Sequence, residues 1–557
     1  MEKTGADIIL ETLAKEGVEV IFGYPGTNSL PIIDRISDSP IDHYLVRHEQ
    51  AAAHAADGYA RATGKVGVCL STSGPGATNM VTGIATAYMD STPLVALTAQ
   101  VTSDLLGSDA FQETDIIGIT MPITKHSFLI TRVEKLESTL EEAMEIARSG
   151  RPGPVLVDLP INVITARCES MGKKKAGFAK KKTANRKEII AKVRQIAQHL
   201  NEAERPIIMI GGGIKLGDAC IPVSELIEQG QIPFVTTMMG IGSVHSSNGF
   251  NLGFIGTHGS ELANRTVHQA DFILAVGTRF SDRSTSKIAQ FAPLATIAQI
   301  DIDPTSIGKN IKSDIALVAD IAEAVKELTP LVKKKKRSEW LERIERDRSN
   351  IEERHQSTGF GKVAKFIRKV QEAMGEEAIA VADVGLNQIW TLHSWRSNTP
   401  RGLLTSGGMG TMGFSLPAAI GAKIGSPDRE VVVFSGDGGF FMNIQELATI
   451  SYYNLPVKII VFNNGYLGMI RQFQYLFYNA RFNACELGDK VDITAVAQGF
   501  GIPAEKVSLD NSVAGIENIR RAQGPYLLEV TVDPNNYVFP IIPPGRSNME
   551  MIYGRPE

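Results

Sequence analysis

Two polar motifs, each preceded by a short apolar run, constrain the fold of the last third of this chain more than any other feature. The first is a glycine-rich turn around Asp437, which follows the apolar run 431–434. The second is an asparagine pair that ends at Asn464 and follows the run 457–462. Runs of this length are typical of buried strands in a parallel sheet, and the segment 441–452 between them is long enough for a helix. Because parallel strands end at a common edge, where α/β folds bind ligands, the pattern predicts a βαβ unit that brings Asp437 and Asn464 together.

The residue types at these strand ends indicate a metal and a diphosphate. The glycines around Asp437 permit tight turns and a close approach of backbone N–H groups to a phosphate, while Asp437 and Asn464 offer the hard oxygen ligands that Mg²⁺ prefers. Most isolated Gly-Asp-Gly tripeptides are only turns. Combined with the asparagine pair at this spacing, however, the motif resembles the thiamine diphosphate signature. That resemblance implies Mg²⁺ held by Asp437, Asn464 and the backbone carbonyl of Tyr466.

Length and composition predict a soluble α/β protein. The 557 residues exceed a single core and suggest about three domains, and 52 glycines fit many tight turns. The net charge of −4 argues against a nucleic-acid partner. The four cysteines are far apart, as expected in a reducing cytoplasm. We expect neither a signal peptide nor a membrane span, because the N-terminus soon reaches acidic residues and no long apolar run occurs.

Two lysine-rich stretches, 173–182 and 333–337, divide the chain. We interpret both as solvated connections, since neither is interleaved with the aromatic residues typical of a nucleic-acid surface. The predicted fold class is α/β with three Rossmann-like, doubly wound parallel-sheet domains. The expected divisions are 1–170, 186–335 and 356–535, followed by a tail, 536–557.

The first domain repeats the pattern of the last. An apolar run leads into a glycine turn at Gly74, then a helix-length segment, then a second apolar run from Pro93. Gly74 to Pro93 is 19 positions, and Gly436 to Pro456 in the later copy is 20. A duplicated α/β unit explains this similarity. Pro75 takes the place of Asp437, so the early copy cannot bind a metal there and is free for another task.

Glu49 is the candidate for that task. It follows the strand-like run 43–46 and precedes an alanine-rich helix, 51–62. A glutamate at such a junction is usually only a helix-start residue. Thiamine enzymes, however, keep at the end of an early strand the acid that contacts N1′ of the aminopyrimidine, and Glu49 stands in that place. An apolar setting is expected to keep it protonated near neutrality, as this role requires.

The central segment has the alternating pattern of a nucleotide-binding domain. Three apolar runs end in Gly211-Gly212-Gly213, Gly277-Thr278-Arg279 and Asp301-Ile302-Asp303. Glycines after strands can approach phosphates, and an acid after a later strand can bind ribose. The spacing does not satisfy Gly-x-Gly-x-x-Gly, so a nucleotide site and a plain structural spacer both stay open.

Over nearly its whole length the chain resembles the catalytic large subunit of acetohydroxyacid synthase, also called acetolactate synthase. The segments most specific to that family are 279–283 and 307–310. The other matching segments are 23–26, 72–79, 109–113, 124–128, 150–154, 302–306 and 410–414.

The resemblance implies a homodimer, or a tetramer built from two dimers, and leaves room for a regulatory small subunit. Thiamine diphosphate would lie between the pyrimidine-binding first domain of one subunit and the diphosphate-binding last domain of the other, so that Glu49 acts across the interface. The central domain would bind FAD without net redox chemistry. The residues implied for thiamine diphosphate are Asn387, Gln388, Gly410, Met412, Gly438 and Gly439. Those implied for FAD are Arg151, Gly212, Gly213, Thr237, His258, Arg279, Asp301 and Asp320.

The implied reaction is decarboxylation of pyruvate and ligation of the remaining two-carbon unit to a second 2-oxoacid. It would give 2-acetolactate or 2-aceto-2-hydroxybutanoate for branched-chain amino-acid synthesis. Arg283 is the candidate for binding the acceptor's carboxylate, with an ion pair to Asp282 as the structural alternative. Gln112 and Lys125 are candidates for the substrate channel. Phe473 replaces a family tryptophan associated with 2-oxobutanoate preference, so we expect a roomier, less selective pocket.

Three other readings fit parts of the sequence. A pyruvate oxidase or a 2-oxoacid decarboxylase of the same three-domain plan would share the metal motif. A nicotinamide-dependent oxidoreductase would use the central domain but would leave Asp437, Asn464 and Glu49 unexplained. A non-catalytic paralogue is disfavoured by the presence of the same three residues.

Overall fold

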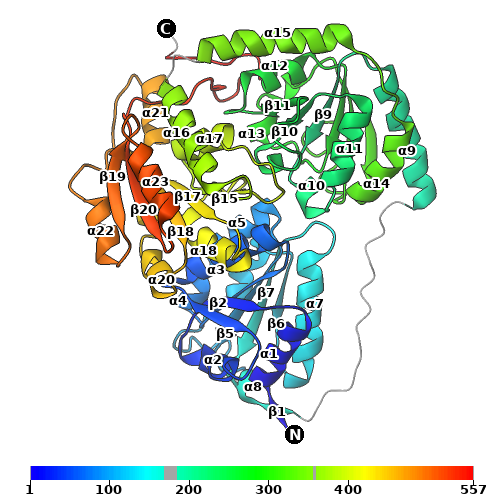
Figure 1. Ribbon diagram of the computed structural model, residues 1–557. Helices are drawn as coiled ribbons and strands as arrows, with labels where there is room; N and C mark the ends of the chain where they lie inside the picture. Colours follow the sequence, from blue (N-terminus) through cyan, green and yellow to red (C-terminus); the bar gives the residue numbers. More distant parts are fainter. Residues whose placement is uncertain (1, 169–184, 356–358, 556–557) are drawn as a thin grey trace.

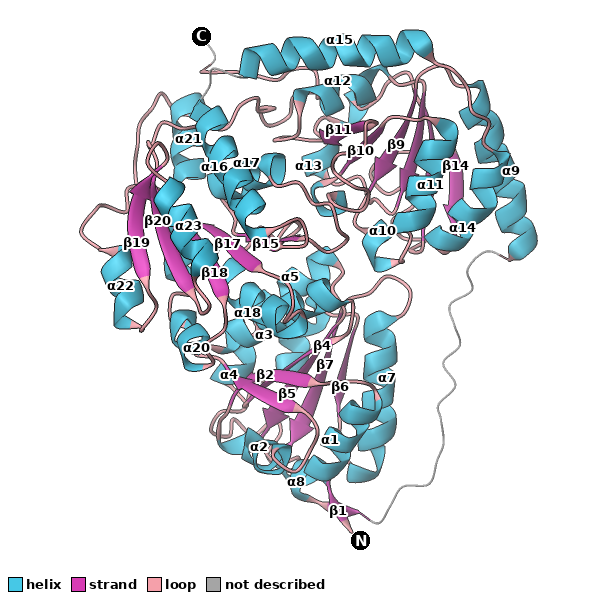
Figure 2. Cartoon of the chain, in the orientation of Figure 1, coloured by secondary structure: helices cyan, strands magenta, loops and turns pink. Residues whose placement is uncertain are grey.

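The computed structural model describes residues 2–168, 185–355 and 359–555. These residues form three α/β units, each built on a six-stranded parallel sheet (Figures 1 and 2). The predicted fold class is therefore confirmed. The lysine-rich stretch 173–182, which we interpreted as a linker, lies outside the described residues. Within the described part of the chain, no helix combines the length and apolar character that crossing a bilayer requires.

The first unit has the strand order β3-β2-β4-β5-β7-β6. Leu94 and Ala96 of its central strand join one apolar cluster and Val95 and Leu97 join another, so both faces of the sheet are buried. The strands are β2 (Val20–Tyr24), β3 (Asp42–Leu45), β4 (Gly67–Ser71), β5 (Leu94–Gln100), β6 (His126–Leu129) and β7 (Pro154–Pro160). The helices are α1 (Gly5–Lys15), α2 (Leu30–Ile36), α3 (Glu49–Thr63), α4 (Pro75–Asn79), α5 (Val81–Asp90), α6 (Ile116–Thr120), α7 (Leu136–Arg148) and α8 (Ile161–Thr165). A short antiparallel pair, β1 (Lys3–Thr4) and β8 (Arg167–Cys168), joins the ends of the unit.

The central unit has the order β11-β10-β9-β12-β13-β14. Numbered within the unit, this is 3-2-1-4-5-6, the order of dinucleotide-binding folds. The strands are β9 (Pro206–Ile210), β10 (Phe234–Thr236), β11 (Asn251–Phe254), β12 (Phe272–Val276), β13 (Thr296–Asp301) and β14 (Ile315–Val318). The helices are α9 (Arg186–Glu202), α10 (Gly213–Leu216), α11 (Cys220–Gly230), α12 (Glu261–Gln269), α13 (Asp282–Thr285), α14 (Ile321–Leu328) and α15 (Ser338–His355).

The last unit has the order β16-β15-β17-β18-β20-β19. Within-unit numbering gives 2-1-3-4-6-5, which is also the order of the first unit, as the sequence repeat predicted. The strands are β15 (Ile379–Ala382), β16 (Leu403–Thr405), β17 (Val431–Gly436), β18 (Val457–Asn463), β19 (Ala504–Ser508) and β20 (Tyr526–Thr531). The helices are α16 (Gly359–Met374), α17 (Leu386–Ser394), α18 (Ser415–Gly425), α19 (Asp437–Met442), α20 (Glu446–Tyr452), α21 (Gly468–Phe477), α22 (Ile493–Gly499) and α23 (Val513–Arg521).

The connection between β17 and β18 differs from the single helix that we expected. It consists of two short helices, α19 and α20, separated near Asn443. The side-chain amide of Asn443 donates to the carbonyl of Gly413 in a neighbouring loop, at 2.7 Å. This tertiary hydrogen bond lies at the break between the two helices. No local sequence pattern predicts the bond.

The second lysine-rich stretch, 333–337, is not the fully solvated linker that we expected. Arg337 is only 3% exposed, and its guanidinium donates to the carbonyls of Leu200, Ala203 and Gly230. The following helix α15 packs on the central unit through Trp340. Arginine can be buried in this way because carbonyl acceptors satisfy its donors.

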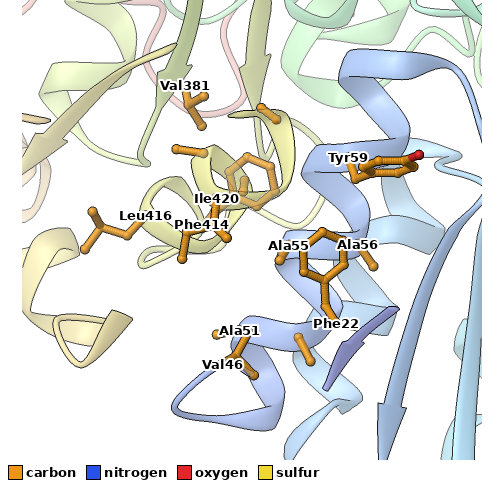
Figure 3. Packing of buried hydrophobic residues seen from close by; sticks show 14 of the residues in the cluster. Phe22, Val46, Ala51, Ala55, Ala56, Tyr59, Val381, Phe414, Leu416 and Ile420 are labelled. Atoms are coloured by element: carbon orange, nitrogen blue, oxygen red, sulfur yellow. The ribbon is translucent and has the colours of Figure 1, made fainter. Parts of the chain in front are cut away.

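The first and last units share one apolar cluster, in which α3 of the first unit packs against α18 of the last (Figure 3). Phe22 and Ala55 on one side face Phe414 and Ile420 on the other. The backbones approach so closely at Gly58 and Gly421 that an added Cβ would overlap α18 and α3 respectively. Glycine is therefore required at both positions for the helices to meet.

Candidate active site

Asp437 and Asn464 lie at the ends of neighbouring strands, as predicted. β17 pairs in parallel with β18, with Gly436 opposite Phe462. The Asp437 carboxylate accepts hydrogen bonds from Gly465 N at 2.8 Å and Gly438 N at 3.0 Å, which joins the two loops directly. Burial raises the pKa of Asp437 to about 6, against the lowering effect of these N–H groups. A cation beside the carboxylate would offset that burial.

The oxygen atoms at this edge suit a hard divalent cation. Asp437 supplies a carboxylate, Asn464 an amide oxygen and Tyr466 a backbone carbonyl, and no imidazole or thiol competes among them. The Asn464 Oδ1 atom also accepts from Tyr466 N at 2.9 Å, which fixes the loop. Among the described residues, no group of three His, Cys, Asp or Glu side chains forms another metal site.

Gly438, Gly439 and Met412 come together beside this loop. A Cβ on Gly438 would lie 3.4 Å from the methyl group of Met412, and one on Gly439 would meet the carboxylate of Asp383. Asp383 is fully buried and accepts from Gly413 N and Ser415 N, both at 2.9 Å. Sequence reasoning missed Asp383, although an acid directly after the apolar strand β15 was the available signal.

Gly410, also expected at the cofactor, precedes Met412 in the same loop. It has a φ of +69°, a conformation that favours glycine. The loop around it also contacts the first unit, because Asp90 accepts from Gly407 N at 3.0 Å and Gly408 N at 2.7 Å. The loop that carries Gly410 and Met412 is therefore held from both terminal units.

Asn387 and Gln388 are buried supports of the same edge. The Asn387 amide donates to the carbonyl of Asp383 at 2.7 Å and to that of Phe434 at 3.2 Å, which ties β15 to β17. Gln388 donates to Thr405 Oγ1 at 2.7 Å and so ties α17 to β16. The side-chain amides of both residues thus donate to groups of the sheet edge itself. Their contact with a diphosphate stays a prediction.

Glu49 begins helix α3 and lies beside the turn that follows β4. Its carboxylate accepts from the amide of Asn79 at 2.9 Å, and a Cβ on Gly76 would come within 3.3 Å of its Oε1 atom. The backbone of Gln112 lies against the same turn, because a Cβ on Gly74 would come within 2.9 Å of the Gln112 carbonyl oxygen. The structure therefore brings Glu49 and Gln112 to one turn.

The residues proposed for FAD lie along the carboxyl edge of the central sheet. Every strand of that sheet contributes at or just after its end: Gly212 and Gly213 follow β9, Thr237 follows β10, His258 follows β11, Arg279 follows β12, Asp301 ends β13 and Asp320 follows β14. In parallel α/β sheets this edge is where nucleotides bind.

Two arginines connect this edge to the first unit. Arg279 donates to the carbonyl of Met89 at 2.8 Å. Arg151 donates to Ser91 Oγ at 2.8 Å and lies 3.6 Å from the carboxylate of Asp303. The predicted FAD residues from two units are thus adjacent.

Two buried groups at the same edge have strongly shifted pKa values. Burial raises the pKa of Asp301 to about 6. Burial, with smaller contributions from His393 and Arg283, lowers the pKa of His258 to about 4. The His258 Nδ1 atom is buried without a hydrogen-bond partner in the described structure, so this edge presents a polar atom that a ligand could satisfy.

Arg283 and Lys125 have different surroundings. The Arg283 side chain is 70% exposed, and its Nε atom is 3.8 Å from the carboxylate of Asp282, which is 86% exposed, so their pairing is weak. Its guanidinium is therefore accessible to a substrate carboxylate. Lys125 Nζ donates to the carbonyls of Ser149, at 2.7 Å, and Ile146 at the C-terminal end of α7. A cation stabilises a helix end there, and a place for Lys125 in a substrate channel stays a prediction.

A separate cavity of about 130 Å³ lies where the three units meet. Arg61 of the first unit, Lys215 of the central unit and Arg401 of the last unit are among its lining residues. The lining includes neither Glu49 nor Asp437, so this cavity is not the predicted catalytic centre.

Three family models match the chain in succession and define its class. They are described as the N-terminal TPP binding domain, the central domain and the C-terminal TPP binding domain of thiamine pyrophosphate enzymes, and they match residues 3–119, 193–328 and 383–530. Thiamine pyrophosphate is another name for thiamine diphosphate. The first and third models match the units that carry Glu49 and Asp437.

Relatives of nearly equal length identify the branch of that class. A probable acetolactate synthase large subunit of Methanocaldococcus jannaschii is 44% identical, with 97% of this chain and 94% of the relative covered. The acetolactate synthase isozyme 2 large subunit of Escherichia coli (strain K12) is 39% identical, with 98% and 99% covered. An acetolactate synthase of Mycobacterium bovis is 41% identical, with 98% and 91% covered. The chain belongs to the acetolactate synthase large-subunit family of thiamine pyrophosphate enzymes.

Proposed function

We propose that this chain decarboxylates pyruvate and ligates the remaining two-carbon unit to a second 2-oxoacid, which gives 2-acetolactate or 2-aceto-2-hydroxybutanoate for branched-chain amino-acid synthesis. The observation that carries the proposal is the hydrogen-bonded junction of the Asp437 and Asn464 loops at neighbouring strand ends. Full-length similarity to acetolactate synthases selects carboligation from the reactions of the wider class.

The donor set fits Mg²⁺ and the diphosphate of thiamine diphosphate. Asp437, Asn464 and the carbonyl of Tyr466 would hold the metal, while Gly438 and Gly439 let backbone N–H groups approach the diphosphate. Met412 and the carbonyl of Gly410 would contact the rings. When bound, thiamine diphosphate supplies the nucleophilic carbon and accepts the electrons released on decarboxylation.

The protein's own residues have three tasks in this reaction. Glu49 exchanges a proton with the N1′ atom of the aminopyrimidine, which requires its carboxyl group to stay close to a ring nitrogen. Arg283 binds the carboxylate of the acceptor 2-oxoacid through its planar guanidinium. Gln112, which lies against the same turn as Glu49, contacts the substrate. Exclusion of water from this space prevents loss of the two-carbon unit as aldehyde.

The carboxyl edge of the central unit fits FAD. The strand order is that of dinucleotide-binding folds, Asp301 and Asp320 are suited to hydrogen bonding, and the partnerless Nδ1 of His258 is available to a ligand. The guanidinium groups of Arg151 and Arg279 place positive charge at the same edge. FAD there would have a structural role without net redox chemistry.

The assembly that we propose is a homodimer, alone or paired into a tetramer, with each active site between two subunits. The relatives named as large subunits support a regulatory small-subunit partner. The domain limits that we propose are 1–170, 186–335 and 356–535, with the tail 536–557. Helix α15, which packs on the central unit, would connect the second and third domains.

One incubation tests the proposed activity. Purified protein with pyruvate, Mg²⁺ and thiamine diphosphate should release CO₂ and accumulate 2-acetolactate, and the absorbance spectrum of the protein should show bound flavin. Oxygen consumption with acetyl phosphate or acetate would instead identify an oxidase, and acetaldehyde as the main product a decarboxylase. Activity unchanged in Glu49→Gln would contradict the assigned role of Glu49.

A further inference from the structure

The backbone that leads into Glu49 is held by two side chains of the last unit. Residues 45–48 connect β3, the edge strand of the first sheet, to helix α3. Tyr453 OH accepts from Leu45 N at 2.9 Å, and Glu446 Oε1 accepts from Arg47 N at 3.0 Å. The backbone N–H of His48 also acts to lower the pKa of Glu446. Strand edges and helix starts leave N–H groups without partners, and here the last unit satisfies them.

Glu446 lies inside this contact between the first and last units and not on the protein surface. It is fully buried and its second oxygen accepts from Thr449 Oγ1 at 2.8 Å. Burial raises its pKa to about 7, and the N–H groups that it accepts from act in the opposite direction. A buried carboxylate is costly unless it is hydrogen-bonded, and one of its two oxygens accepts from the backbone of Arg47, two positions before Glu49.

We propose that Glu446 is a positioning residue for Glu49, fixing from the last unit the backbone from which this acid projects. This inference rests on the proposed function, in which Glu49 acts at the cofactor. Glu446 begins α20, which follows the metal-binding Asp437 and α19 along the chain. The Glu446 carboxylate therefore links the loop that carries Asp437 to Glu49 of the same chain.

In the proposed dimer this link connects two different active sites. Each site takes Glu49 from one subunit and Asp437 from the other, so the Glu446 contact within one chain joins the acid of one site to the metal loop of its neighbour. Rearrangement of the metal loop at one site would thereby shift the acid of the second.

The first test compares cofactor activation with cofactor binding in Glu446→Gln. The amide keeps the size of the side chain but replaces one of the two acceptor oxygens, which accept from Arg47 N and Thr449 Oγ1, with an NH₂ donor. The rate at which the C2 proton of bound thiamine diphosphate exchanges in D₂O, followed by acid quench and proton NMR, should fall by about tenfold, with affinity for Mg²⁺ and thiamine diphosphate unchanged. Glu505→Gln is the control, because Glu505 bonds to Tyr526 and Asn518 of the last unit. It should exchange normally.

The second test asks which site Glu446 serves, using heterodimers purified through two different affinity tags. One heterodimer carries Glu49→Gln and Glu446→Gln on the same chain beside a wild-type chain. The other carries the two substitutions on opposite chains. With the substitutions on one chain, both defects affect one site and about half of the wild-type rate should remain. On opposite chains both sites are impaired, and the rate should fall far below half.

The opposite ranking would overturn the proposal, because it would mean that Glu446 supports the Asp437 loop of its own chain. Equal rates for the two heterodimers, or unchanged proton exchange in Glu446→Gln, would also overturn it. A reference heterodimer with Glu49→Gln alone reports separately on the proposed function. If that reference keeps the full wild-type rate, the role of Glu49 is wrong, whatever Glu446 does.

Discussion

Gly58 of α3 lies directly against the backbone of Ala418 of α18, and this contact joins the unit that carries Glu49 to the unit that carries Asp437. A methyl group on Gly58 would overlap the Ala418 carbonyl. The close approach of the two units therefore requires glycine at position 58, as it does at position 421.

Gly58→Ala should lower the free energy of unfolding by about 1–3 kcal/mol, the usual cost of overpacking. Urea denaturation followed by circular dichroism measures this change. Gly499→Ala, at a helical position with open space around it, is the matched control and should be neutral or slightly stabilising. Equal free energies of unfolding for the two variants would show that the contact between α3 and α18 accommodates the added methyl group without cost.

Asp437→Asn should weaken Mg²⁺-dependent binding of thiamine diphosphate at least about tenfold, or ~1.4 kcal/mol. The substitution removes the charge that would face the proposed metal, and it removes one of the two oxygens that accept from Gly438 N and Gly465 N. Titration calorimetry at several Mg²⁺ concentrations measures the affinity. Asp489→Asn, on an exposed loop of the same unit, is the control and should bind thiamine diphosphate with wild-type affinity. Wild-type affinity in Asp437→Asn would show that Asp437 is not a metal ligand.

The stability of the protein should depend on pH through Asp158, whose carboxylate accepts from Thr98 Oγ1 at 2.7 Å and Gln100 Nε2 at 3.1 Å between β5 and β7. Burial raises the pKa of Asp158 from 3.8 to about 7. The folded protein therefore keeps a proton that the unfolded chain releases, and its contribution to stability is complete below pH 4 and lost as the pH rises through 7, at about 1.4 kcal/mol per pKa unit.

Asp158→Asn should flatten this dependence, because an amide does not titrate. Urea denaturation at pH 5 and pH 7.5 would show a smaller difference for Asp158→Asn than for the wild type. Asp218→Asn, whose side chain is 94% exposed, should retain the wild-type difference. A wild-type difference retained in Asp158→Asn would mean that Asp158 is ionised in the folded protein across this range.

Phe473→Trp should raise the preference for 2-oxobutanoate over pyruvate as acceptor. Phe473 lies on α21, close behind the Asn464 loop, and its ring stacks on Phe477 with centroids 5.9 Å apart. A larger indole in this place would narrow the acceptor pocket and add apolar contact to the extra methyl group, which is worth roughly 1 kcal/mol. Competition between the two acceptors, with both products quantified, gives the ratio. An unchanged ratio would place Phe473 outside the acceptor pocket.

The positions of Asp437 and Asn464 at one edge of the last sheet were predictable because the sequence patterns that indicate them are local. The Asp437 and Asn464 motifs each follow an apolar run, and strand pairing and edge position follow from the βαβ pattern. The strand order of the central unit was not predictable, since it depends on pairing between strands that are not adjacent in the sequence. The contacts of Glu446 were not predictable either, since Arg47 lies 399 positions away. The Asn443 bond that accompanies the break between α19 and α20 is also a tertiary contact, to a residue 30 positions away.

Charged residues were the least predictable. A basic run predicts a solvated segment, yet Arg337 is buried, because carbonyls at the ends of separate elements satisfy its guanidinium. Lys125 was predicted from family resemblance alone, and its amine bonds to carbonyls at the end of α7. Side-chain charge indicates what a residue can bind, whereas the tertiary fold decides which acceptors it meets.

The common strand order of the first and third sheets means that one topology carries both polar turns of the proposed site. In the third sheet an aspartate follows the third strand, whereas in the first sheet a proline stands at that place and the acid follows the second strand. A coenzyme that uses both acids would therefore meet two sheet edges of the same design, each of which supplies the group that the other lacks.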